Sequence, residues 1–159
     1  MRVIERKHSM IFFVDGPRGA GKTFLYCTLL ANLRKLGHIA IATATSGIAV
    51  TLLPGGRIAH SRFKIPLTLD ASSTCSISIQ SDLAELIRSA TVVVWDEAPM
   101  VNRRAVEAFD KTLKDIMEVD SPFGGKMVIF RGDFRQVLPV VPNGTRSEII
   151  DTCIVKSPL

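Results

Sequence analysis

Apolar residues along the chain alternate between short runs and stretches of helical period. The short runs are rich in β-branched and aromatic side chains, which predicts strands over residues 10–14, 39–44, 91–95 and 127–130. Between the first two runs, apolar side chains recur every three or four positions, which predicts a helix over residues 23–36. Its apolar positions are Phe24, Leu25, Leu29, Leu30, Leu33 and Leu36. Strands that alternate with helices predict an α/β fold with a parallel sheet covered on both faces.

Polar residues at the ends of these stretches predict where further helices begin. A short helix over residues 46–53 is capped by Thr45 or by its own first serine. Asp82 and Glu85 have the spacing of a capping box, which opens a helix that ends near residue 90. Asn102 caps a longer helix after the third strand. The carboxyl ends of the strands then form the expected ligand-binding edge of the sheet.

A glycine-rich motif lies between the first strand and the first helix. Residues 16–23 match G-x-x-x-x-G-K-[ST], whose backbone N–H groups curl around an anion. Lys22 can reach the β- and γ-phosphates of a nucleotide, and the Thr23 hydroxyl can ligate Mg²⁺. The strand and helix that flank the motif disfavour a chance glycine-rich turn. The predicted cofactor-binding residues of this loop are Gly16, Gly19, Ala20, Gly21, Lys22 and Thr23.

The third strand ends in an Asp-Glu pair. Asp96 closes an apolar run that is typical of a buried strand, at the place where phosphate-bound Mg²⁺ lies in nucleotidases of this architecture. Glu97 is then the natural base for an attacking water. A solvated strand end is the simpler alternative for such a pair, but the phosphate loop favours a catalytic role. A GTPase is disfavoured because Asp96 is not followed by the x-x-Gly of that class, so the pattern predicts hydrolysis of ATP.

Composition limits the class of protein. With 159 residues, 47% of them hydrophobic and 22% charged, the chain is typical of one soluble α/β domain. No apolar run approaches the ~18 residues of a membrane span, and the first residues lack the apolar core of a signal peptide. Cys27, Cys75 and Cys153 are odd in number and widely spaced, which predicts reduced thiols in an intracellular protein. The net charge of +5 permits a polyanionic partner without requiring one.

Two polar segments are open to more than one interpretation. The segment Arg57–Lys64 is basic and contains no acidic residue, but composition alone favours a solvated loop over a nucleic-acid contact. The segment 132–139 contains Gln136, whose amide can donate to a phosphate oxygen and accept from a water at once. Spacing alone does not separate such a γ-phosphate sensor from a polar loop.

Four stretches of the chain together resemble the first RecA-like domain of a superfamily-one DNA helicase of the Pif-one (petite integration frequency) family, in its plant and Helitron-transposon branch. They are FFVDGPRGAGKTFLY, TSGIAVTLLPGGRIAHSRFKIPL, VVVWDEAPM and FGGKMVIFRGDFRQVLPVVPNGTR. The resemblance implies a P-loop NTPase fold, with residues 1–159 as a single N-terminal ATP-binding domain. It also implies ATP and Mg²⁺ as cofactors, single-stranded DNA and duplex junctions as partners, and a monomeric protein whose full-length form unwinds DNA.

The resemblance also implies a role for individual residues. Lys22, Glu97 and Gln136 would be catalytic, through phosphate binding, water activation and γ-phosphate sensing. Asp96 and Thr23 would hold the metal. The residues that would contact the backbone of single-stranded DNA are Thr45, Ser46, Gly47, His60, Ser61 and Arg62. The resemblance therefore implies that the basic segment contacts single-stranded DNA rather than forming a solvated loop.

The chain departs from the family pattern at Arg18, Ala20 and Arg131. Arg131 replaces a glycine, and we expect it to strain the turn that aims Gln136. The resemblance further implies that a second RecA-like domain, with its arginine finger, lies outside these residues, so slow ATP turnover and no strand separation are expected of residues 1–159. The alternative is a truncated, transposon-derived remnant that binds ATP or DNA without turnover. The nucleus is the expected compartment, with the mitochondrion as the second.

Overall fold

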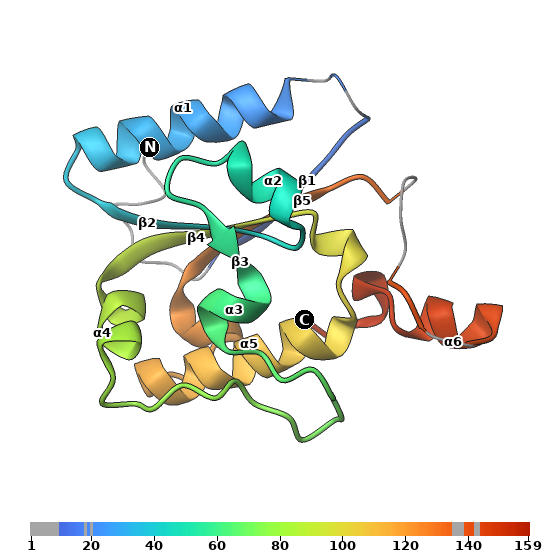
Figure 1. The fold of residues 1–159 in the computed structure, drawn as a ribbon. Coiled ribbons are helices and arrows are strands. Elements are labelled where there is room, and N and C mark those ends of the chain that lie inside the picture. The colour runs from blue at the N-terminus through green and yellow to red at the C-terminus, as the bar shows by residue number, and fades with distance from the viewer. Residues whose placement is uncertain (1–9, 18, 20, 135–138, 142–143) are drawn as a thin grey trace.

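A parallel sheet organises the part of the chain that the computed structural model describes, which is residues 10–17, 19, 21–134, 139–141 and 144–159 (Figure 1). The strand order is β1-β5-β4-β2-β3, and each neighbouring pair is parallel. The strands are β1 (Ile11–Asp15), β2 (Ile39–Ala44), β3 (Arg57–Ile58), β4 (Ala90–Asp96) and β5 (Met127–Gly132). This arrangement confirms the predicted sheet and adds β3, a two-residue strand that the apolar pattern did not reveal.

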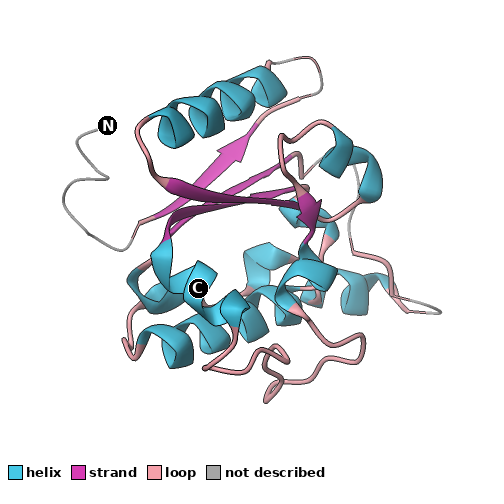
Figure 2. Cartoon of the chain, turned by 60° about the vertical axis from the view of Figure 1, so that its left-hand side comes forward, coloured by secondary structure: helices cyan, strands magenta, loops and turns pink. Residues whose placement is uncertain are grey.

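Helices cover both faces of the sheet, with α1 and α2 on one face and α3, α4 and α5 on the other (Figure 2). The helices are α1 (Lys22–Lys35), α2 (Gly47–Thr51), α3 (Ala59–Phe63), α4 (Asp82–Ser89), α5 (Arg103–Met117) and α6 (Arg146–Asp151). Short 3-10 turns are η2 (Ala98–Met100), η3 (Pro122–Gly125) and η4 (Ile154–Lys156). The two covered faces confirm the α/β fold class.

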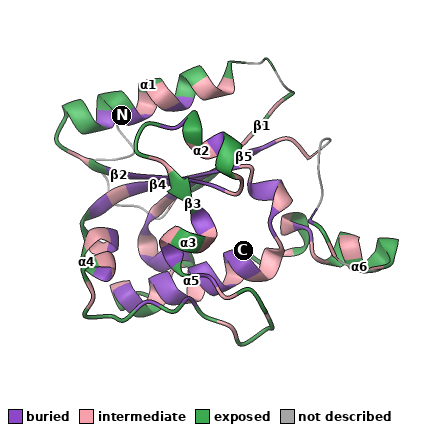
Figure 3. Cartoon of the chain, in the orientation of Figure 1, coloured by how far each residue is buried: buried purple, intermediate pink, exposed green. Residues whose placement is uncertain are grey.

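The two faces of the sheet bury different side chains. On the α5 face, Trp95 packs against Phe63, Phe109 and Phe130, with ring centroids 5.6–6.1 Å apart. On the α1 face, smaller aliphatic side chains of the sheet pack against α1, whose outer side is exposed (Figure 3). Edge-to-face and offset aromatic contacts add to the free energy of burial. The aromatic cluster therefore fixes the end of β4, the strand that carries the Asp-Glu pair.

Two details of the predicted helices were wrong. In α1, Phe24 and Leu25 are exposed, whereas Tyr26 is buried against the sheet. The apolar spacing identified the helix but not its buried face, because a tyrosine takes one of the core positions. In α4, the cap is Ser81, whose hydroxyl accepts a hydrogen bond from the Ala84 N–H, so the predicted capping box does not form.

Other predicted boundaries were confirmed. Ser46 caps α2 by accepting from the Ala49 N–H. Asn102 caps α5 by accepting from the Arg104 N–H. These two caps lie directly after β2 and shortly after β4, so they fix how the chain leaves the strands at the predicted ligand-binding edge.

The carboxyl ends of the four longer strands meet at one edge of the sheet. Asp15 pairs with Gly132 across β1 and β5, and Ala44 pairs with Asp96 across β2 and β4. The loops that follow these residues therefore start side by side. This register confirms that the phosphate loop, the Asp-Glu pair and the segment after β5 converge although they are far apart in sequence.

No described helix is both long and apolar enough to cross a membrane. Cys27, Cys75 and Cys153 are all free, and the last two are buried. Burial raises the pKa of the Cys75 thiol to about 11, so this thiol stays protonated near neutral pH.

Candidate functional site

The glycine-rich loop joins β1 to α1 and turns through two left-handed residues. Gly19 and Gly21 have φ values of 80° and 71°, a region that glycine adopts without the strain of a side chain. Gly21 precedes the first turn of α1 and offers no side-chain cap, so the first N–H groups of the helix stay available at the loop. Ala20 and Arg18 lie outside the described residues. The described part of the loop has the features of an anion cradle.

Lys22 lies at the start of α1 and folds back over this loop. Its ammonium donates hydrogen bonds to the carbonyl oxygens of Gly16 and Pro17, the latter at 2.6 Å. The lysine charge is thereby held at the loop by acceptors of the loop itself. A nucleotide phosphate at this position would replace these carbonyls as the acceptor, and its charge would make the hydrogen bond stronger.

Asp96 is the last residue of β4 and is 4% exposed. Its Oδ1 accepts from the Glu97 N–H at 2.7 Å, and its Oδ2 accepts from Nη1 of Arg131 at 2.6 Å. Burial raises the pKa of the Asp96 carboxyl above its usual value, and the Arg131 charge acts in the opposite direction. A buried carboxylate in this position is suited to hold a cation.

Arg131 was not predicted to belong to the site. The strain that it was expected to place on the turn before Gln136 stays a prediction, because residues 135–138 lie outside the described residues. Arg131 lies within β5, where it pairs with Val14 of β1, and it is not among the residues with positive φ. Its Nη2 donates to the Thr23 hydroxyl at 2.9 Å, while Nη1 contacts Asp96. The sequence signals were a charged residue near the end of an apolar strand and the replacement of a family glycine at this position.

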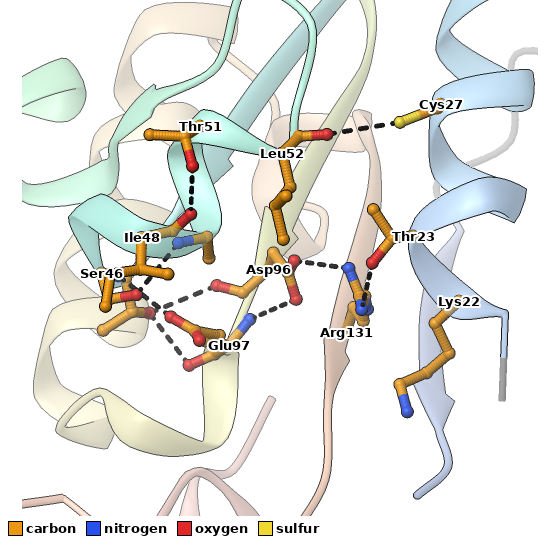
Figure 4. Close-up of polar contacts among 12 residues, drawn as sticks. Lys22, Thr23, Cys27, Ser46, Ile48, Thr51, Leu52, Asp96, Glu97 and Arg131 are labelled. Carbon is orange, nitrogen blue, oxygen red and sulfur yellow. Dashed lines mark hydrogen bonds and ion pairs between the residues drawn. The ribbon is translucent and has the colours of Figure 1, made fainter. Parts of the chain in front are cut away.

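Thr23 and Asp96 therefore both contact one cation, the guanidinium of Arg131 (Figure 4). The oxygen atoms of a hydroxyl and a carboxylate are the hard ligands that Mg²⁺ prefers. Because one guanidinium reaches both oxygens, the two side chains point toward a common position. The residues present consequently fit the Mg²⁺ that the sequence predicted.

Glu97 follows β4 in a left-handed backbone conformation, with φ of 56°. Non-glycine residues adopt this conformation where their surroundings hold them. Here the Glu97 carbonyl accepts from the Thr45 hydroxyl at 2.9 Å, and the Glu97 carboxylate accepts from the Ser46 N–H at 3.2 Å. The indole of Trp95 also donates to the Thr45 hydroxyl, at 3.1 Å. The predicted base is thus tied to the predicted DNA-contacting segment.

The end of β5 packs closely against the turn after Glu97. A Cβ on Gly132 would lie 2.1 Å from Cδ of Pro99, so only glycine allows this approach. The predicted γ-phosphate sensor, Gln136, lies outside the described residues, and its role stays a prediction. The packing nevertheless fixes the direction from which the segment after β5 leaves the sheet.

These elements enclose one cleft with a cavity volume of about 480 Å³. Its lining residues are Gly19, Gly21, Lys22, Thr23, Ile48, Ala49, Leu52, Asp96, Glu97, Pro99, Met100, Arg131, Gly132 and Asp133. The size is within the range of clefts that hold small molecules and cofactors. Polar groups from α1, β4 and β5 face an apolar wall from α2.

The basic segment, residues 57–64, forms β3 and α3 rather than a loop, while Arg57 and Lys64 are exposed. Its contact with DNA stays a prediction. Ile58 pairs with Ala44, the last residue of β2, which brings the segment beside Thr45–Gly47. Of the predicted DNA-contacting residues in α3, Ser61 is exposed, while His60 and Arg62 are half-buried. Burial lowers the pKa of His60, so its imidazole is neutral near pH 7.

Arg62 was predicted to contact DNA, and its surroundings favour an anionic partner. Its Nε is buried and has no hydrogen-bond partner among the described residues. Burial lowers the pKa of Arg62, and the nearby charge of Arg57 lowers it further. A phosphate placed beside these two guanidinium groups would relieve their repulsion.

A model of the PIF1-like helicase family matches residues 1–159. The chain belongs to the PIF1-like helicase family. It is 31% identical over 137 residues to the ATP-dependent DNA helicase Pif1 of Psychrobacter sp., covering 86% of this chain. It is also 31% identical over 145 residues to the ATP-dependent DNA helicase RRM3 of Saccharomyces cerevisiae, covering 88% of this chain.

Solved structures of this family share the fold. The Pif1 helicase from Bacteroides, in complex with ADP-AlF3 and single-stranded DNA, matches with a TM-score of 0.81, 28% identity and 99% of this chain covered. The chain spans 37% of the length of that Bacteroides chain and 20% of each of the two curated relatives. The likeness confirms the RecA-like P-loop fold.

Proposed function

We propose that this chain binds ATP with Mg²⁺ in the cleft and single-stranded DNA beside it, as the ATP-hydrolysing part of a DNA helicase. The observation that carries the proposal is the convergence of Lys22, Thr23, Asp96 and Glu97 on one cleft at the carboxyl edge of the sheet. The Pif1 helicase from Bacteroides, which this chain resembles, was solved with ADP-AlF3 and single-stranded DNA. In the whole protein, ATP hydrolysis would drive translocation along DNA and unwinding.

The residues of the cleft divide the chemistry among them. The Lys22 ammonium and the N–H groups at the start of α1 bind the phosphates. Glu97 accepts the proton of the water that attacks the γ-phosphate, and Gln136 reports whether that phosphate is present. When bound between Thr23 and Asp96, Mg²⁺ supplies the charge that neutralises the phosphate oxygens.

The DNA contact adjoins this chemistry. Thr45, Ser46 and Gly47 would hold the sugar-phosphate backbone through hydroxyl and N–H groups, and α3 would add Ser61 and Arg62. Ser46 already donates its N–H to the Glu97 carboxylate. Single-stranded DNA that binds at Ser46 therefore acts on the residue whose N–H holds the proposed base, Glu97. This contact gives a physical route for DNA to stimulate ATP turnover.

We further assign the chain to the plant and Helitron-like branch of the family, to a monomeric state and to the nucleus. The branch is supported by the four sequence stretches that resemble it. The compartment is supported by the DNA that the proposed function requires.

The test combines hydrolysis with binding. Purified protein is assayed for phosphate release from ATP with and without single-stranded DNA of mixed sequence, and for binding of a fluorescent ATP analogue and a labelled oligonucleotide. We expect both ligands to bind, and DNA to raise the slow rate of phosphate release. Binding of neither ligand contradicts the proposed function. Binding of both, with phosphate release no faster than that of the Glu97→Gln protein, supports the non-enzymatic remnant instead.

A further inference from the structure

Arg131 joins three elements at the point where a metal ion is needed. Its guanidinium forms an ion pair with Asp96 of β4 and donates to Thr23 of α1, at 2.6 and 2.9 Å. The same group lies 5.5 Å from the ring centroid of Tyr26, within the range of a cation–π contact. The side chains of Arg131 and Asp96 are only 13% and 6% exposed, so water screens this ion pair weakly.

The guanidinium uses the two oxygen atoms that would ligate Mg²⁺. Nη1 is bound to the Asp96 Oδ2, and Nη2 is bound to the Thr23 Oγ1 (Figure 4). A metal ion and the guanidinium are both cations and would have to share one position at the same oxygens. Their repulsion at that distance makes simultaneous occupancy unfavourable.

We propose that the Arg131 guanidinium is the counter-ion of Asp96 and occupies the metal position in the nucleotide-free chain. Mg²⁺ then binds the Asp96 carboxylate only after the guanidinium has moved away from it. The inference rests on the proposed function, because it concerns the same cleft. Arg131 lines that cleft together with Lys22. The phosphates of a nucleotide offer the guanidinium a second anion, which it can bind through two parallel (bidentate) hydrogen bonds. Nucleotide and metal therefore enter together, and the metal alone is excluded.

The surroundings of Arg131 support a side chain that can change partners. The Nε of Arg131 and the hydroxyl of Tyr26 are buried and have no hydrogen-bond partner among the described residues. An arginine fixed permanently in a structural ion pair would leave fewer of its donors unused. Removing the guanidinium would leave the buried Asp96 carboxylate without its counter-ion, and a divalent cation would then bind there more readily.

The experiment measures how Mg²⁺ alone affects thermal unfolding of the nucleotide-free protein, with NaCl at matched ionic strength as the blank. Wild type, Arg131→Gln and Arg104→Gln are compared, because Arg104 pairs with Glu107 on α5, outside the cleft. We expect wild type and Arg104→Gln to show no Mg²⁺-specific shift in melting temperature. Arg131→Gln should melt lower without Mg²⁺ and regain ~2–4 °C at millimolar Mg²⁺.

Two further variants keep the outcome decisive. Adding Asp96→Asn to Arg131→Gln should abolish the gain, because the carboxylate that binds the metal is lost. If Arg131→Gln does not fold, Arg131→Lys takes its place, since a lysine keeps the charge but cannot reach both oxygens, and a smaller Mg²⁺-specific shift is expected. A Mg²⁺-specific shift in nucleotide-free wild type, or none in any folded Arg131 variant, overturns the proposal.

The same proteins separate this inference from the proposed function. A fluorescent ATP analogue is titrated into wild type and Arg131→Gln, with Mg²⁺ and with a chelator. Analogue binding by wild type together with an unchanged Mg²⁺ response in Arg131→Gln refutes only the role of Arg131. A Mg²⁺ gain in Arg131→Gln without analogue binding by any variant refutes only the proposed function.

Discussion

Asp96 and Glu97 are neighbours in sequence, but they face two different sides of the cleft. The Asp96 side is held by side-chain charge, because Arg131 links this carboxylate to Thr23 of α1. The Glu97 side is held by hydrogen bonds that each join a side chain to the backbone: the Ser46 N–H donates to the Glu97 carboxylate, and the Thr45 hydroxyl donates to the Glu97 carbonyl. The left-handed conformation of Glu97 produces this divergence.

The difference shows how one strand end can serve two tasks. An ion pair can exchange its partner when a phosphate or a metal arrives, so the Asp96 side is suited to recognise charge. On the Glu97 side, the Trp95 indole packs in the aromatic cluster and also holds the Thr45 hydroxyl, so this side is suited to position a base and to sense a bound DNA strand.

The largest expected effect separates the two carboxylates. Glu97→Gln keeps the shape and hydrogen bonding of the side chain but removes the base, so ATP turnover should fall by ~10²–10⁴ while analogue binding persists. Asp96→Asn should instead make analogue binding insensitive to Mg²⁺. Phosphate release and analogue titration measure the two outcomes. Turnover at the wild-type rate in Glu97→Gln would show that Glu97 is not the base.

The second effect concerns packing beside Asp96. In Gly132→Ala the added Cβ would lie 2.1 Å from Cδ of Pro99, so we expect a loss of ~1–3 kcal/mol in the free energy of unfolding. Gly47→Ala is the matched control, because a Cβ there meets no atom within 4 Å. Urea unfolding compares both variants with wild type. Equal stability of Gly132→Ala and wild type would mean that β5 and η2 are not held together in this way.

The third effect tests the DNA surface beside Glu97. Replacing Arg57, Arg62 and Lys64 with glutamine should reduce the slope of log affinity against log salt by up to ~2, at ~0.7 for each phosphate contact with single-stranded DNA. The control replaces Lys35, Lys111 and Lys114, which lie on α1 and α5 rather than on β3 and α3. Fluorescence anisotropy at several salt concentrations gives the slopes. An unchanged slope in the first triple variant excludes these residues from the DNA contact.

The smallest effect concerns His60, which lies in α3 on the proposed DNA surface. Burial lowers its pKa in the folded chain, so the neutral imidazole contributes stability above its usual pKa, and this contribution is lost as the pH falls through the lowered value. The stability advantage of wild type over His60→Gln should therefore shrink between neutral pH and about pH 5. Urea unfolding at both pH values measures it. An advantage that grows toward acid pH contradicts the direction of this shift.

Much of this arrangement was predictable from sequence because local patterns determine it. The glycine-rich motif, the strand that ends in Asp96 and the caps Ser46 and Asn102 each depend on residues close together in the chain. Parallel pairing then brings them to one edge. Their joint position follows from the general rule for such sheets, which needs no knowledge of individual contacts.

The contacts of Arg131 were not predictable in this way. They depend on the exact register of β5 beside β1 and on which face of the strand each side chain occupies. Tyr26 was missed for a related reason, since an aromatic hydroxyl does not stand out as a core residue until α1 is packed on the sheet. β3 is too short for any periodicity, so its pairing with β2 became visible only in three dimensions.

The most direct test of the central claim is titration of a fluorescent ATP analogue into wild type, Lys22→Ala and Lys35→Ala in the presence of Mg²⁺. Lys35 is the matched control because it lies at the other end of α1 and is exposed. We expect the analogue to bind to wild type and to Lys35→Ala. Its affinity should fall by ~10²-fold or more in Lys22→Ala, because the ammonium makes charge-assisted hydrogen bonds to the phosphates. Equal affinity of all three proteins would contradict the assignment of the phosphate site.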